Sequence, residues 1–136
     1  MANAIYPKAK KRFMAADIDL TTVAVYAALI NVSGSGTLYA YSATHASLAD
    51  VPSGAIIATS PALTGKLLND DASFNSDDPT FFAVAGQSIE ALILYADDGT
   101  STYLIMYQDS GVTGLPLTPD GSDVQVLVDA AGWFVL

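Results

Sequence analysis

Apolar residues form short runs along most of the chain, and segments that contain glycine, proline or aspartate separate these runs. The runs recur about every ten residues, a spacing typical of an antiparallel β-sandwich or barrel. The first run, residues 23–32, contains small and β-branched side chains, which favours a buried strand over a long helix. Further strands are predicted over residues 37–41, 55–59, 62–68, 80–84, 88–95, 102–107, 124–128 and 133–136. The pattern therefore predicts an all-β fold.

The clearest pair of strands is a predicted hairpin, which joins residues 88–95 to residues 102–107 through a turn at residues 97–101. Apolar and polar residues alternate only weakly in both strands, a pattern typical of strands that are buried on both faces. We expect a sandwich core to cover one face and another subunit to cover the other. The final strand carries Trp133 and Phe134, which are assigned to the core.

The start of the chain differs from this β pattern. Pro7 suits the first turn of a helix, where its missing N–H needs no partner, and residues 8–16 are rich in good helix formers. The sequence therefore predicts a short helix in a basic N-terminal arm, residues 1–16, and a single β-sandwich domain over residues 17–136.

Charge is divided unevenly between these two parts. Four of the five basic residues lie in the arm: Lys8, Lys10, Lys11 and Arg12. Residues 13–136 hold fourteen acidic residues and one basic residue, Lys66, which gives them a net charge of −13. The basic cluster is interpreted as a docking element for an acidic neighbour, and another copy of this chain would qualify. The alternative is a solvated helix face.

Length and composition limit the class of protein. With 136 residues, the chain has the size of one domain. It is 51% hydrophobic and 14% charged, with a mean hydropathy of +0.39, which excludes disorder and indicates a largely neutral surface that a partner covers. The formal charge of −9 argues against nucleic acid as a partner, because phosphate contacts need clustered Lys and Arg.

The chain offers little for a cofactor, a disulfide or a membrane. It has no cysteine, which removes disulfides and thiolate chemistry, and its one histidine, His45, is too few for a multi-histidine metal site. The start of the chain lacks the apolar core of a secretory signal, and residues 23–30 are far fewer than the ~20 apolar residues that cross a bilayer. We expect a soluble protein made in the cytoplasm, with no cofactor, no membrane contact and no small-molecule substrate.

Catalytic motifs are also lacking in the sequence. It contains no Walker loop, no dinucleotide-binding glycine motif, no Gly-x-Ser-x-Gly elbow and no His-Glu-x-x-His. His45 and Ser47 are close in sequence but form no recognisable nucleophile motif, so both are interpreted as surface or capping residues. An enzyme is the most distant of three classes, and we expect no enzymatic activity.

Some polar and aromatic positions leave a ligand-binding module open as a second class. Three aspartate pairs lie in predicted turns: Asp70/Asp71, Asp77/Asp78 and Asp97/Asp98. Turn carboxylates bind calcium in many β proteins, although solvated turns are the simpler interpretation. Glu90 lies within an apolar strand, where we expect it to pair with Lys66 or with a neighbour's basic arm. Tyr39 and Tyr41 share one predicted strand face, either for cross-strand packing or as a sugar platform.

Five short segments occur in a characteristic order along the chain. They are Ile-Tyr-Pro-Lys (5–8), Tyr-Ser-Ala-Thr-His (41–45), Ala-Leu-Thr-Gly-Lys (62–66), Ala-Gly-Gln-Ser-Ile-Glu-Ala-Leu (85–92) and Ser-Gly-Val-Thr-Gly-Leu-Pro-Leu-Thr-Pro-Asp-Gly (110–121). In this order they resemble a family of small structural proteins from tailed bacteriophages, and the resemblance spans nearly the whole chain. It implies a virion component with no enzymatic role.

Within virions, the favoured role is that of a head decoration or cement protein, a minor capsid protein that binds the assembled capsid and stabilises it. A small acidic β domain with a neutral surface and a docking arm suits a place over the joints between capsid subunits. The expected partners are the major capsid protein and other copies of this chain, such as in a trimer, and the expected location is the capsid surface. A tail or fibre-attachment role is the alternative.

Overall fold

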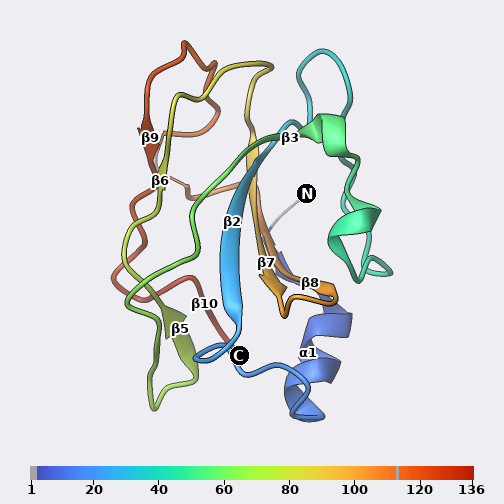
Figure 1. Cartoon of the computed structure of the whole chain (residues 1–136), viewed down its shortest axis with the longest axis vertical. Coiled ribbons are helices and arrows are strands. Elements are labelled where there is room, and N and C mark those ends of the chain that lie inside the picture. The colour runs from blue at the N-terminus through green and yellow to red at the C-terminus, as the bar shows by residue number, and fades with distance from the viewer. Residues whose placement is uncertain (1–2, 113) are drawn as a thin grey trace.

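Strands dominate the computed structural model, which describes residues 3–112 and 114–136 (Figure 1). The α-helix in these ranges, α1 (Pro7–Met14), lies near the N-terminus, and no helix described there is long and apolar enough to span a membrane. The strands pair antiparallel in a five-stranded, a three-stranded and a two-stranded sheet, with no closed barrel among the described residues. The predicted all-β class and the short N-terminal helix are confirmed.

The five-stranded sheet has the order β1-β8-β7-β2-β3. Its strands are β1 (Ala4–Ile5), β2 (Ala24–Ile30), β3 (Ile56–Thr59), β7 (Ala91–Asp97) and β8 (Thr102–Gln108). The predicted hairpin is the β7–β8 pair, and β2 pairs with β7 over its whole length. Because β2, β7 and β8 are nearly uniformly apolar, they occupy the middle of the sheet, where both faces are buried.

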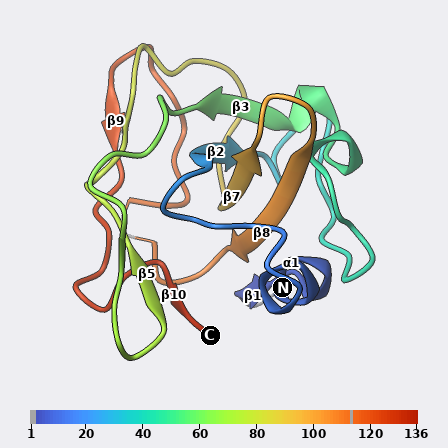
Figure 2. The same cartoon turned by 60° about the horizontal axis from the view of Figure 1, so that its bottom comes forward.

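Two small sheets cover one face of the five-stranded sheet (Figures 1 and 2). They have the orders β10-β5-β4 and β6-β9, with strands β4 (Leu67–Leu68), β5 (Ser73–Asn75), β6 (Thr80–Phe81), β9 (Val124–Gln125) and β10 (Phe134–Val135). Phe74, Phe81 and Trp133 of this layer share one hydrophobic core with Leu29 and Leu92 of the central strands. Trp133 is therefore a core residue, as predicted.

The chain itself also covers the opposite face of the central sheet. Helix α1 and the segment that contains the 3-10 turns η1 (Leu48–Asp50) and η2 (Ser53–Ala55) lie on this side (Figure 2). Tyr6, Ala9 and Tyr39 of this layer form a second hydrophobic core with the central strands. The expectation that another subunit covers this face is therefore wrong, because one chain builds three layers.

The N-terminal segment is part of this packed unit. Strand β1 pairs with β8, with Ala4 opposite Tyr107 and Ile5 opposite Met106. The helix that follows is anchored by Tyr6 and Ala9, both fully buried. Residues 4–14 therefore belong to the domain rather than to a projecting arm.

Several predicted strands are shorter or absent. Residues 37–41 form no strand, because they cross the second face as a loop in which the Tyr39 N–H donates to the Asn31 carbonyl at 3.0 Å. Only β4 remains of residues 62–68, and only β6 of residues 80–84, where Ala83 takes a positive φ of 49°. The last two predicted strands likewise reduce to β9 and β10. The covering layers thus consist mainly of loops with short paired segments.

Candidate docking surface

The basic residues that were predicted to dock lie on α1. One side of this helix is buried against the sheet, so the orientation of each basic side chain depends on its position around the helix. Pro7 occupies the first turn of the helix, and Ala9 is fully buried against the sheet. The other side of the helix therefore faces solvent. Three lysines are exposed there: Lys8, Lys10 and Lys11. We call these three residues the lysine face.

Arg12 is separated from the lysine face by its own contacts. Its guanidinium lies 4.3 Å from the centre of the Tyr103 ring on β8, which is a cation–π geometry. Its Nη1 also donates to the carbonyl of Ala46 at 3.4 Å. The predicted docking set is therefore divided, because Arg12 fixes the end of α1 to the domain. The sequence around Arg12 does not indicate that Tyr103 is its partner, because Tyr103 is distant in the sequence.

Tyr6 anchors the beginning of α1. Its N–H donates to the carbonyl of Ile105 at 2.9 Å, and its ring centre lies 5.1 Å from that of Tyr41. Burial of a large side chain of this kind contributes about 1.5–3 kcal/mol. The two ends of α1 are thus held by Tyr6 and Arg12, so the lysine face is presented from a rigid base.

A chain of hydrogen bonds joins this anchor to His45. The hydroxyl oxygens of Tyr6 and Tyr39 lie 2.7 Å apart, and the Tyr39 hydroxyl lies 2.8 Å from His45 Nδ1. Burial raises the pKa of the Tyr6 and Tyr39 phenols, so both stay neutral. All three groups are satisfied when Tyr6 donates to Tyr39 and Tyr39 donates to His45 Nδ1. His45 thus ends the chain of hydrogen bonds at a partly buried position.

Ser47 is a helix cap, as the sequence suggested. Its Oγ accepts the N–H of Ala49 at 3.0 Å, and Asp50 Oδ2 accepts the N–H of Ser47 at 3.1 Å. This reciprocal arrangement is a capping box at the start of η1. The hydroxyl and the neighbouring carboxylate are therefore both used by the local backbone.

Tyr39 and Tyr41 pack against other aromatic rings. Tyr39 is only 1% exposed, and the ring centre of Tyr41 lies 5.3 Å from that of Tyr107. A sugar platform needs open ring faces. Both tyrosines therefore pack against other rings, but from a loop, so the predicted shared strand face and cross-strand packing are wrong.

Glu90 is a loop anchor. Its Oε1 accepts the N–H groups of Val32 at 2.8 Å and Ser33 at 2.9 Å, just after β2. Burial raises the pKa of Glu90, but hydrogen bonds from Ser88 and from this stretch of backbone outweigh burial and hold the pKa below its ordinary value. Glu90 therefore fixes the beginning of the loop that covers the second face.

The expected pairing of Glu90 with Lys66 is wrong. Lys66 Nζ instead donates to the carbonyl of Val23, immediately before β2. Burial lowers the pKa of Lys66, and the nearby carboxylate of Asp19 partly opposes this effect. Lys66 thus ties the covering layer to the central sheet.

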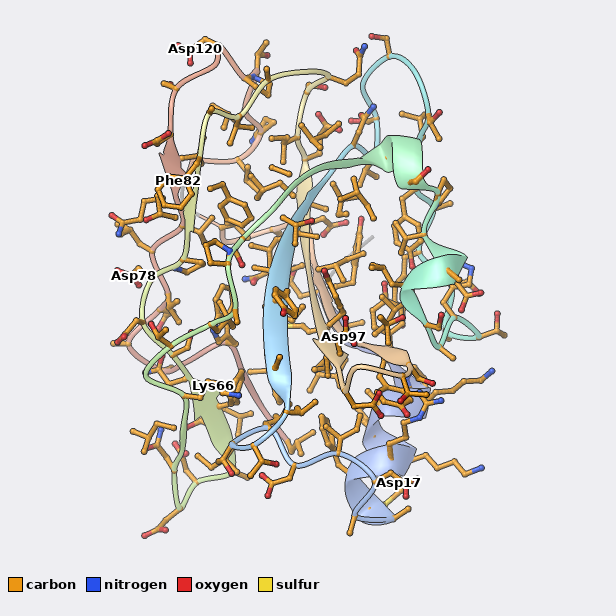
Figure 3. All side chains as sticks on the ribbon, in the orientation of Figure 1. Asp17, Lys66, Asp78, Phe82, Asp97 and Asp120 are labelled. Atoms are coloured by element: carbon orange, nitrogen blue, oxygen red, sulfur yellow. The ribbon has the colours of Figure 1, made fainter. Side chains whose placement is uncertain are left out.

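Members of each aspartate pair accept hydrogen bonds, from their own turn at Asp71 and Asp97/Asp98 and from distant residues at Asp77/Asp78. Asp98 Oδ1 accepts the N–H groups of Ser101 at 2.7 Å and Thr100 at 2.9 Å, and these bonds hold the pKa of Asp98 below its ordinary value. Figure 3 shows that Asp78 and Asp97 lie in separate parts of the molecule. Across residues 3–112 and 114–136, no three His, Cys, Asp or Glu side chains group as a metal site would require.

The comparisons with known proteins identify no relative of this chain. No protein-family model matches the chain, and no curated protein matches its sequence. The resemblance to structural proteins of tailed phages therefore stays a prediction.

Replacing Tyr39 by Phe removes the middle of the hydroxyl chain. The buried Tyr6 hydroxyl then loses the hydrogen-bond partner that it has in the structure, a loss that costs about 1–3 kcal/mol. We expect the free energy of unfolding in urea to fall by this amount. His45→Ala is the control and should cost less, because water can reach the partly exposed His45 position. A larger loss for His45→Ala would contradict the assigned chain.

Replacing Glu90 by Gln keeps the side-chain shape but removes the charge that faces the Val32 and Ser33 N–H groups. We expect stability near neutral pH to fall by about 1–2 kcal/mol. Because folding lowers the pKa of Glu90, its contribution is complete above the ordinary value of 4.5 and is lost as the pH falls through the folded value. Urea midpoints of the two proteins should therefore converge on acidification, whereas parallel pH curves would refute this role.

Proposed function

We propose that this protein is a structural component of a tailed-phage virion, namely a head decoration or cement protein. In this role it binds the assembled capsid and stabilises it, without enzymatic activity. The observation that carries the proposal is the lysine face, which a rigidly mounted helix presents on an otherwise acidic domain. The ordered segments from residues 5–8 to residues 110–121 support the assignment to phages.

A preorganised helix suits attachment to a fixed lattice. Tyr6 and Arg12 hold α1 in one position, so binding through the lysine face costs little conformational entropy in the helix. One exposed ion pair contributes only about 0.2–1 kcal/mol. A symmetric shell, however, repeats the partner surface many times and multiplies weak contacts. The partner surface is acidic and belongs to the major capsid protein or to neighbouring copies of this chain.

The lysine face can be removed without changing the core. We expect the variant Lys8→Gln/Lys10→Gln/Lys11→Gln to bind undecorated heads about tenfold more weakly in co-sedimentation, because three contacts of about 0.5 kcal/mol each give a factor of ten. Glutamine keeps the helix propensity of lysine. The free energy of unfolding should therefore stay within about 0.5 kcal/mol of the original protein.

A matched control carries Ser53→Glu, Ala85→Glu and Thr118→Glu, at exposed positions outside α1. Both variants have a formal charge of −12, three units below the original −9, so the pair separates position from net charge. Equal binding by the lysine variant and the control would remove the lysine face from the proposal. If the original protein binds purified tails but not heads, the head role is wrong and the tail role replaces it.

A further inference from the structure

The outward side of the β6–β9 pair carries two exposed apolar side chains, Phe82 and Leu127, with Thr80 and Gln125 between them. It lies on the opposite side of the molecule from α1 (Figures 1 and 2). Phe81 is fully buried, so the alternation of side chains turns its neighbours Thr80 and Phe82 outward. Val126 is buried too, which turns Leu127 to the same side. Phe82 is 65% exposed and Leu127 is 57% exposed. We call this outward side the β6–β9 face.

A small hollow lies beside Phe82. It has a volume of about 160 Å³, and its lining includes Pro61, Ala62 and Pro79. Thr64, Asp77 and Asp78 also line it, so it is an open surface hollow with both apolar and polar walls. The β6–β9 face therefore offers both a projecting aromatic ring and a recess for one apolar side chain.

Exposed aspartates lie near this face: Asp77 and Asp78 line the hollow, and Asp123 bonds to the backbone beside Phe82. Figure 3 shows Asp78 and Asp120 on the same side as Phe82. Asp78 Oδ1 accepts the N–H of Val128 at 2.8 Å, and Asp123 Oδ1 accepts the N–H of Ala83 at 2.8 Å, so these two carboxylates are fixed in place. The face therefore combines exposed apolar side chains with negative charge, and both contribute to protein interfaces.

The lysine face is complementary to this arrangement. Met14 is 84% exposed and lies one turn beyond Lys10 and Lys11 on the helix. A methionine side chain is flexible and fills irregular apolar recesses. The exposed side of α1 thus combines an apolar side chain with positive charge, whereas the β6–β9 face combines apolar side chains with negative charge.

We propose that the lysine face and Met14 of one copy bind the β6–β9 face of a second copy, with Met14 beside Phe82 over the hollow. This inference rests on the proposed function and names the acidic partner of the same lysine face. Two β6–β9 faces would repel each other through their aspartates, and two lysine faces would repel each other as well. Only the unlike pair joins opposite charges.

The position of the two faces sets the symmetry of the assembly. Because they differ and lie on opposite sides of the chain, the contact is head-to-tail. A head-to-tail contact closes into a ring when its rotation allows, and otherwise continues as an open assembly. A ring of three needs the two contact faces of a chain to be steeply inclined to each other, so faces on opposite sides favour a larger ring or an open assembly over the expected trimer.

Charge reversal tests this contact in the purified protein. We expect the original chain to associate in light scattering at low salt and to dissociate as salt rises. The variant Lys8→Glu/Lys10→Glu/Lys11→Glu should be monomeric. Thr80→Lys/Gln125→Lys alters two residues that lie opposite each other in the β6–β9 pair, and it should weaken association without abolishing it, because two lysines do not outweigh the aspartates around the face. A chain with all five substitutions should associate more strongly than the glutamate variant, because its glutamates then meet two lysines. An equimolar mixture of the two variants should also associate, because it retains one unaltered pair of faces.

The apolar part of the contact has its own test. Phe82→Ser and Met14→Ser should each weaken association by about tenfold or more, as central interface residues do. Leu38→Ser is the control, since Leu38 is a 44% exposed side chain outside both faces, and it should leave association unchanged. A monomeric original protein, an equal effect of Leu38→Ser, or a five-substitution chain that associates no more strongly than the glutamate variant would each overturn the inference.

Co-sedimentation with undecorated heads separates this inference from the proposed function. Suppose that the original protein is monomeric and that heads bind it and the Phe82→Ser variant equally well. This outcome would support the decoration role and overturn the contact between copies. An oligomer that regains association after the charge swap but does not bind heads would support the contact and overturn the decoration role.

Discussion

Burial of both faces of the central strands is the constraint from which the rest of this fold follows. Strands β2, β7 and β8 carry apolar side chains at nearly every position, so neither face of the sheet can be left in water. At about 25 cal/mol per Å² of apolar area, an uncovered face would cost as much as the whole stability of a small domain. A chain of 136 residues must therefore supply two covering layers. It supplies two small sheets on one side, and α1 with the loop between β2 and β3 on the other.

The same constraint decides where charge lies. Tyr6 and Ala9 are needed to cover the second face, so the lysines of α1 have only the solvent side of the helix available. Carboxylates cannot enter either core without a large desolvation cost. They lie in turns and accept backbone N–H groups, as Asp98 does between β7 and β8. The apolar pattern thus confines both kinds of charge to the surface, with the lysines on the outer side of α1 and the carboxylates in turns and loops.

Features that depend on residues close in sequence were predictable, and features that depend on distant partners were not. The β7–β8 hairpin, the buried strand β2 and the N-terminal helix all follow from local patterns. The segment around Tyr39 has the composition of a strand, yet it runs as a loop because its buried ring, rather than backbone pairing, fixes it to the sheet. Of the candidate docking residues, the three lysines lie on an exposed side of the predicted helix, and their docking role stays a prediction. The roles of Arg12 and Glu90 depend on Tyr103 and Val32, which no local signal connects to them.

The negative charge of the domain opposes association between copies in most relative orientations. It therefore limits the orientations in which two copies can bind each other. A formal charge of −9 repels a second copy at long range. At physiological ionic strength the Debye length is about 8 Å, so the charges within that distance of a contact determine its sign. Most pairs of faces bring aspartates near aspartates. A contact that includes the lysine face brings opposite charges together. The specificity of such a contact comes from repulsion in the competing orientations as much as from attraction in the favoured one. In the proposed assembly, repulsion between aspartates therefore excludes the other relative orientations of two copies. The apolar residues Phe82 and Met14 contribute the buried contact area that stabilises the remaining orientation.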